Sequence, residues 1–179
     1  MKPSSNLKIL PLGGYGEVGR NMTALEYDGA IIVIDCGLMF PESDMPGVDL
    51  VLPNFQYLVD NVDRLVAYFI THGHEDHHGA LPYVLPNAPA PIYATRLTRG
   101  LIEVKLKEHK RLAGARITTI EPGERIQAGP FTVEPFRVAH SIPDAVGFAV
   151  ETPLGVVIHT GEYKFDLTPV SGEPTDIHR

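Results

Sequence analysis

The sequence predicts an α/β fold in which strands form a layered sheet and helices pack against it. Three observations carry this prediction. Short apolar runs separated by glycine and proline turns are typical of strands. Helical periodicity is confined to the middle of the chain. The order of strands, then helices mixed with strands, then strands again is typical of layered α/β proteins rather than of helical bundles. The 179 residues suffice for one domain of ordinary size.

The first third of the chain is expected to contain a strand, a glycine-rich loop, a β-hairpin and a helix. Strands are predicted over residues 7–12, 22–27 and 30–35. The last two are joined at Asp28-Gly29, a pair typical of two-residue hairpin turns. A long irregular acidic loop spans 41–53. The helical spacing of Phe55, Leu58, Val59 and Val62 predicts a helix over 53–65.

The rest of the chain is expected to pass from mixed elements to strands. Helices are predicted over 80–85 and 95–109. The second is expected to face the core with Leu97, Leu101 and either Leu106 or Lys105. Strands are predicted over 65–71, 91–94, 117–120, 124–127, 131–137, 147–152 and 156–159.

The composition excludes several classes of protein. A single cysteine, Cys36, excludes an internal disulfide framework and fits a reducing compartment. The net charge of -7 and the absence of tryptophan argue against a nucleic-acid binder that relies on a basic surface or an aromatic platform. No apolar stretch is long enough to span a bilayer, and the first residues lack the apolar region of a signal peptide. We therefore expect a cytoplasmic protein without membrane contact.

A glycine pattern near the N-terminus invites a second hypothesis. Gly14, Gly16 and Gly19 match a dinucleotide-binding fingerprint, and Asp35 follows at a suitable distance. That site requires a helix directly after the glycines to hold the pyrophosphate. The residues that follow predict a β-hairpin instead, so we expect a loop between strands. Whether its backbone approaches a polar substrate stays open.

The strongest chemical signal is a cluster of metal-ligand side chains at the end of a predicted strand. His72, His74, Asp76 and His77 follow the apolar run 66–70. Residues i and i+2 of a strand point to the same side, so His72 and His74 can hold one cation. Asp76 and His77, at the turn into a helix, can face a second. Imidazole and carboxylate together favour Zn²⁺, with Mn²⁺ as an alternative.

Four ligands from one segment cannot complete two metal sites, so others must come from elsewhere. His140 and Glu162 each end a later predicted strand, where loops gather functional residues. His78 is expected to be a neighbour rather than a ligand. His109, His159 and His178 are expected to be polar surface residues.

These motifs resemble the metallo-β-lactamase superfamily. Its signature is His72-x-His74-x-Asp76-His77, and the blocks at 12–22, 34–41, 71–82, 97–107, 140–147 and 160–169 resemble the ribonuclease J family of its β-CASP branch. The resemblance implies an αββα sandwich, incomplete in this chain. Residues 1–179 would form the N-terminal part of the metallo-β-lactamase domain, with the β-CASP and C-terminal domains outside it.

The resemblance also implies a ligand set and an activity. His72, His74 and His140 would hold a first zinc, Asp76 and His77 a second, and Glu162 would bridge them. Asp76 and His77 would also take part in catalysis, and Asp35 would orient the histidines from behind. Relatives cleave RNA from the 5′ end and internally, process ribosomal RNA, and form homodimers or homotetramers in the cytoplasm. Candidate phosphate contacts are Arg20, Arg137 and Lys164.

Glu162 departs from the family pattern, which has aspartate after Thr-Gly. Glutamate is one methylene longer, so it either bridges both metals after a small shift or binds only one. The alternative activity is hydrolysis of a small thioester or lactone with the same metals. The family pattern includes a further ligand histidine beyond the position where this chain stops, so we expect little or no nuclease activity from the isolated chain.

Overall fold

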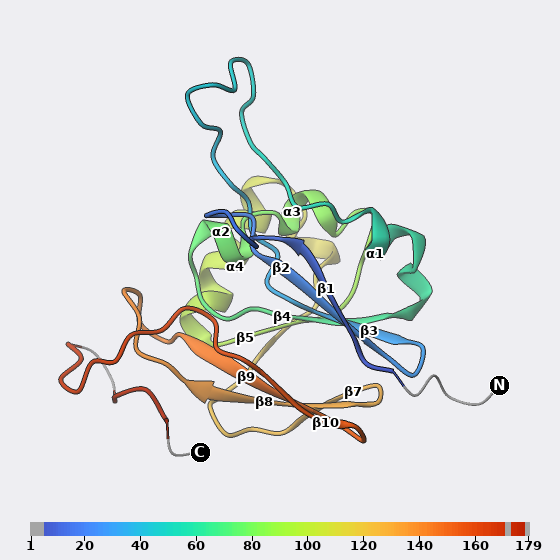
Figure 1. The fold of residues 1–179 in the computed structure, drawn as a ribbon. Coiled ribbons are helices and arrows are strands. Elements are labelled where there is room, and N and C mark those ends of the chain that lie inside the picture. Colours follow the sequence, from blue (N-terminus) through green and yellow to red (C-terminus); the bar gives the residue numbers. More distant parts are fainter. Residues whose placement is uncertain (1–5, 171–172, 178–179) are drawn as a thin grey trace.

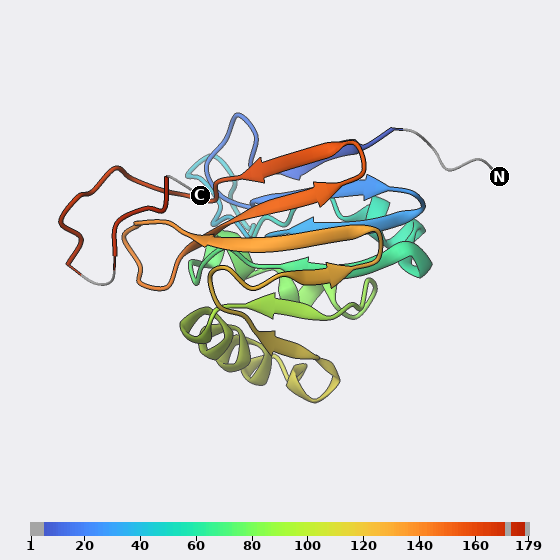
Figure 2. The same cartoon turned by 90° about the horizontal axis from the view of Figure 1, so that it is seen from below.

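The computed structural model describes residues 6–170 and 173–177, which form three layers. Figure 1 shows the helices on one face of a first sheet and a second sheet on its other face. The first sheet has six strands in the order β1-β2-β3-β4-β5-β6, and the second has four in the order β10-β9-β8-β7. The α/β prediction is confirmed. No helix of the described residues covers the outer face of the second sheet (Figure 2). The described residues therefore form an α-β-β part of the sandwich.

The first sheet begins antiparallel and continues parallel. Its strands are β1 (Lys8–Gly13), β2 (Met22–Tyr27), β3 (Ala30–Ile34), β4 (Leu65–Phe69), β5 (Ile92–Ala94) and β6 (Ile117–Thr119). The hairpin at Asp28-Gly29 joins β2 to β3, as predicted, and both turn residues have positive φ. Strands β3 to β6 pair in parallel. Their carboxyl ends therefore lie at one edge of the sheet.

The second sheet is antiparallel. Its strands are β7 (Ile126–Ala128), β8 (Phe131–Arg137), β9 (Val146–Thr152) and β10 (Gly155–His159). Because β8 and β10 both pair antiparallel with β9, they run in the same direction. The loops that carry His140 and Glu162 therefore leave this sheet at the same edge.

Two apolar cores separate the layers. One lies between the helices and the first sheet and includes Tyr68, Ile70 and Leu81. The other lies between the sheets and includes Phe69, Phe131 and Phe148. Strand β4 contributes to both cores because successive side chains point to opposite faces. It is buried on both sides, as expected of a parallel strand inside a sandwich.

The helices differ from the sequence-based expectation in two places. They are α1 (Gln56–Asp60), α2 (Glu75–His78), α3 (Leu81–Val84) and α4 (Arg96–Glu108), with 3-10 turns over Val62–Arg64 and Leu112–Gly114. The predicted helix over 53–65 is wrong in extent, because the chain leaves helical geometry at Asn61, where φ is -126°. Leu65 already belongs to β4.

The predicted inner face of α4 is confirmed at Leu106 but wrong at Leu97 and Leu101. Its buried residues are Thr98, Ile102 and Leu106, whereas Leu97 and Leu101 are exposed. The helix is rotated by one residue, which turns Leu97 and Leu101 towards the loop that carries His140. At 13 residues α4 is the longest described helix, and none of the described helices is long and apolar enough to cross a membrane.

A buried carboxylate on β2 provides a test of the fold. Glu26 accepts hydrogen bonds from Tyr57 and, at 2.9 Å, from Lys8, and its Oε1 lies 2.6 Å from the Arg64 guanidinium. Burial raises the pKa of Glu26, but these hydrogen bonds and charges outweigh burial and lower it to about 2. The folded state therefore binds the Glu26 proton more weakly than the unfolded state, whose value is 4.5.

We expect E26Q to lower the free energy of unfolding at pH 7 by about 2 kcal/mol, the typical worth of hydrogen bonds to a charged group. The difference from wild type should be complete above about pH 4.5 and disappear as the pH falls towards 2. Urea unfolding at pH 7 and pH 3 measures it. E42Q, at an exposed loop position, is the control. A difference that does not change with pH would contradict the assignment.

Candidate metal centre

The cluster of metal-ligand side chains begins where β4 ends. Residues 69–71 and His72 are fully buried, and the chain then turns through Gly73 into α2. Asp76 and His77 lie on this short helix, with His77 buried and Asp76 half-buried. The predicted arrangement is thus present: two histidines at the strand end and two further ligand candidates on the following turn.

The backbone after β3 holds this turn in place. Cys36 N donates to His77 O at 2.7 Å, and Leu38 N donates to Glu75 O at 3.1 Å. Gly37 lies between them, so close that a Cβ atom there would be 1.5 Å from Asp76 O. Only glycine allows the two segments to lie this near. The positions of Asp76 and His77 therefore depend on a segment about 40 residues earlier in the sequence.

Asp35 lies behind the histidines and is 1% exposed. Its Oδ1 accepts a hydrogen bond from Thr71 N at 2.8 Å, and its Oδ2 lies 2.8 Å from His77 Nδ1. Burial raises the pKa of Asp35, but the charge and hydrogen bond of His77 and the Thr71 amide outweigh burial, so its pKa is lowered. An ionised Asp35 accepts a hydrogen bond from the His77 Nδ1–H, which leaves His77 Nε2 facing the cluster.

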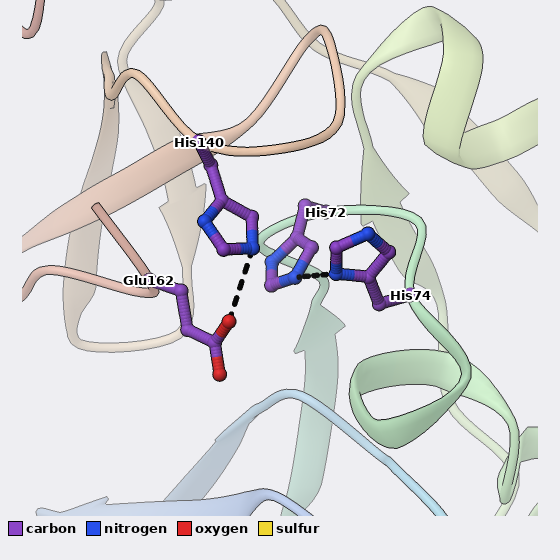
Figure 3. A group of neighbouring side chains, drawn as sticks. All are labelled: His72, His74, His140 and Glu162. Carbon is purple, nitrogen blue, oxygen red and sulfur yellow. Dashed lines mark hydrogen bonds and ion pairs between the residues drawn. The ribbon is translucent and has the colours of Figure 1, made fainter. Parts of the chain in front are cut away.

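The first donor group contains His72, His74, His140 and Glu162, shown in Figure 3. One nitrogen or oxygen from each side chain lies within 4.8 Å of the others. His72 Nε2 is 3.0 Å from His74 Nδ1, and His140 Nε2 is 3.0 Å from Glu162 Oε2. Thr71 Oγ1 lies 3.0 Å from His72 Nδ1, which leaves Nε2 for the centre.

The second donor group contains Asp76, His77 and Glu162. His77 Nε2 lies 3.3 Å from Glu162 Oε1 and 3.6 Å from Asp76 Oδ2. Glu162 thus turns one oxygen towards each group. The extra methylene of glutamate therefore does not prevent the carboxylate from reaching both donor groups.

Burial and neighbouring charges give the histidines different pKa values. Burial, together with the neighbouring histidines, lowers the pKa of His72 to about 3. Burial also lowers the pKa of His140. For His77, burial lowers the pKa, but Asp35, Asp76 and Glu162 outweigh burial and raise it to about 9. A cation at His77 Nε2 would take the place of the proton there, and the same carboxylates that stabilise the protonated ring would stabilise the cation.

The other histidines have different environments. His78 is buried and its Nε2 donates to Gly73 O at 3.2 Å, so it is a neighbour of the cluster. His109 is exposed, as predicted, and packs its ring against Tyr83. The prediction for His159 is wrong: it is half-buried and its Nδ1 accepts a hydrogen bond from Gly161 N at 3.2 Å. Burial lowers its pKa. His178 lies outside the described residues.

Two residues of the site escaped sequence analysis. Asn21 Nδ2 donates to Asp76 O at 3.1 Å and lies 3.1 Å from His77 Nε2. Thr71 Oγ1 donates to Asp35. Neither is a usual metal-ligand type, so a search for ligand patterns passes over both. Their place in the sequence is the signal that could have indicated a role in the site: Asn21 ends the glycine-rich loop, and Thr71 precedes the first histidine of the cluster.

Two hollows adjoin the centre. A groove of about 1070 Å³ extends from His140 between α4 and the 137–146 loop, and Arg137 and Lys164 line it. A smaller polar cavity of about 320 Å³ lies beside His77 and Glu162, with Gly13 and Gly14 in its wall. The glycine-rich loop therefore does approach the site. The dinucleotide alternative is wrong, because β2 rather than a helix follows the glycines.

The three candidate phosphate contacts are placed differently. Arg20 pairs with Glu17 at 2.7 Å, outside the large groove. Lys164 pairs with Asp166 at 3.0 Å and lines the groove. Arg137 is exposed and also lines it. Of the three candidates, Arg137 and Lys164 therefore border the groove that reaches His140, which Arg96 also lines.

The donor set fits a metal centre. Imidazole nitrogens and carboxylate oxygens converge from three segments, and hydrogen bonds at the far nitrogens of His72 and His77 turn the near nitrogens inward. Metal-binding histidines commonly have such partners. The family model "Beta-lactamase superfamily domain" matches residues 31–172, so the chain belongs to this superfamily.

Similarity to individual proteins narrows the family further than the superfamily match does. The chain is 46% identical over 178 residues to ribonuclease J of Thermus thermophilus, covering 96% of this chain and 31% of that protein. It is 47% identical to ribonuclease J of Corynebacterium glutamicum, covering 98% of this chain and 24% of that protein. The chain is thus a homologue of the ribonuclease J proteins. It spans about a quarter to a third of the length of these curated relatives.

Solved structures agree on the fold. The metallo-beta-lactamase fold protein YhfI from Bacillus subtilis matches with a TM-score of 0.59 and 18% identity, over 89% of this chain and 62% of that chain. A protein of unknown function from Enterococcus faecalis matches with a TM-score of 0.62 and 18% identity, over 88% of this chain and 43% of that chain. At this identity the likeness concerns the fold alone.

The contact between Asp35 and His77 can be tested by metal binding. We expect D35N to weaken zinc binding about 10- to 100-fold, because His77 loses the carboxylate that fixes its orientation. T71V keeps its shape but lacks the hydroxyl group, and should weaken binding less. Titration against a chromophoric chelator measures both.

The exposed variant D63N serves as the control, and circular dichroism checks that each variant is folded. Wild-type zinc affinity in folded D35N would show that Asp35 does not organise the centre.

Proposed function

We propose that this chain provides the metal centre of a metal-dependent ribonuclease. The observation that carries the proposal is that Glu162 belongs to two donor groups at once. His72, His74 and His140 would hold one divalent cation, Asp76 and His77 a second, and Glu162 would bridge them. Imidazole-rich donors favour zinc over manganese.

A pair of such cations would supply Lewis acidity, which favours deprotonation of water and stabilises negative charge on a phosphate. The residues of the chain organise this chemistry. Asp35 holds the proton of His77 on Nδ1, so that Nε2 remains a donor. Asn21 donates to the Asp76 backbone and lies 3.3 Å from Asp76 Oδ2. This contact restrains the Asp76 carboxylate, to which we assign the orientation of the attacking water.

Two observations favour RNA over a small carbonyl substrate. The relatives that match across the chain bear the name ribonuclease J. The groove that reaches His140 is about 1070 Å³ in volume and has Arg137 and Lys164 in its wall, where they can contact phosphates. The resemblance to this family extends the proposal to 5′-to-3′ and internal cleavage in RNA processing and decay, by a cytoplasmic homo-oligomer.

The proposal predicts metal-dependent cleavage of 5′-monophosphorylated single-stranded RNA, at the low rate expected of the isolated chain. Protein in excess over RNA allows one slow turnover to be detected on a gel. D76N should slow this cleavage at least 100-fold, within the range for loss of a positioned catalytic group, and a chelator should abolish it. A thioester substrate is tested in parallel.

E42Q, in the exposed acidic loop, is the matched control and should cleave like wild type. Thioester hydrolysis with no RNA cleavage would replace the proposal by the small-molecule hydrolase. RNA cleavage that survives both the chelator and D76N would refute this centre as its source.

A further inference from the structure

The loop that carries His140 is held by groups outside it: Ala139 N donates to Thr175 Oγ1 and Ala139 O accepts from Lys164 N, both at 2.8 Å. It leaves β8 after Arg137 and returns at β9, and Val138 N donates to Ala145 O at 3.1 Å across its base. His140 must nevertheless lie beside His72 and His74, whose ring centroids are 4.7 and 5.1 Å from its own. Something outside the loop has to set its position.

Asp144 makes the contact that links this loop to α4. Its Oδ2 accepts a hydrogen bond from Leu97 N at 2.9 Å, and its backbone carbonyl accepts one from Thr95 Oγ1 at 2.8 Å. Leu97 N is one of the amides at the helix start that lack a partner within the helix. Thr95, the residue at the cap position, makes no side-chain capping bond. Asp144 therefore caps α4 from a loop that lies 47 residues later.

The backbone at Asp144 is suited to this task. Its φ is +69°, in the left-handed region that aspartate, asparagine and glycine tolerate best. A carboxylate at a helix N-terminus also interacts favourably with the helix dipole. The bond to Leu97 and this conformation together turn the end of the loop back towards β9.

Helix α4 also contacts the loop between His72 and His74. A Cβ atom at Gly73 would lie 2.4 Å from Leu101 Cδ1 and 3.3 Å from Ile142 Cδ1. Leu101 of α4 and Ile142 of the His140 loop thus pack on the same glycine. Lys105 of α4 pairs with Glu75 of α2 at 2.8 Å. The two ligand-bearing loops are therefore both held against one helix.

We propose that Asp144 is a positioning residue for His140. Its carboxylate fixes the His140 loop to the start of α4, and α4 in turn contacts the His72–His74 loop. Asp144 contacts no donor atom of the centre and acts through His140. This inference rests on the proposed metal centre.

The test measures zinc affinity and the His140 ring in a set of variants. We expect D144A and D144G to weaken zinc binding about 10- to 100-fold, as is usual for residues that orient metal ligands. D144N keeps an acceptor oxygen and tolerates positive φ, so it should stay within about threefold of wild type. D144G separates backbone strain from loss of the hydrogen bond. Glycine adopts positive φ without strain, but it cannot accept the hydrogen bond from Leu97 N. D28A is the matched control, since Asp28 also has positive φ, 47°, but lies in the exposed β2–β3 turn.

A double-mutant cycle with H140A tests the route of action. If Asp144 acts through His140, D144A should change the zinc affinity of H140A by less than about threefold. NMR of the metal-free proteins provides a second readout: the His140 ring signals should shift in D144A and D144G and not in D144N or D28A.

Wild-type zinc affinity and unshifted His140 signals in D144A would overturn the inference, as would equal losses in D144N and D144A. An undiminished effect of D144A in the H140A background would overturn it too. Absence of zinc binding by the wild-type chain would instead refute the proposed function, and the His140 signals would still decide whether Asp144 positions that ring.

Discussion

The site depends on one buried contact, between the Asp35 carboxylate and the groups that surround it. Asp35 follows β3, and the parallel register of β3 and β4 brings it beside Thr71. A carboxylate that is 1% exposed is costly to bury unless it is paired and hydrogen-bonded. Thr71 and His77 meet both conditions. The same bonds fix the end of β4 and the orientation of His77, so the fold and the site share this constraint.

The remaining donors follow from the way the two sheets stack. Strands β8 and β10 run in the same direction in the second sheet, so the loops after them reach the edge where β4 ends. Val146 N donates to Thr71 O at 2.9 Å and links the sheets beside His72. Lys164 N donates to Ala139 O at 2.8 Å and links the His140 and Glu162 segments. The centre is therefore a product of tertiary packing rather than of a single motif.

The sequence predicted most of the strands because they are marked by apolar runs and by turns such as Asp28-Gly29. It also predicted the six ligand candidates, because histidine and carboxylate at strand ends are chemically distinctive. The face of α4 was not predictable from apolar spacing alone: Leu97 and Leu101 recur as regularly as Ile102 and Leu106. The structure buries Thr98 instead, whose hydroxyl lies 3.1 Å from Thr95 Oγ1. The contacts of Asn21, Gly37 and Asp144 were not predictable, since each is made with a segment far away in the sequence.

The central claim is that two cations lie on either side of Glu162, and anomalous diffraction from zinc-loaded crystals tests it most directly. The account predicts two peaks. The stronger should lie among His72, His74, His140 and one Glu162 oxygen, and the weaker beside Asp76, His77 and the other oxygen, because the first group offers four donors and the second three. Zinc bound elsewhere on the chain, or a Glu162 side chain turned away from the metal, would contradict it.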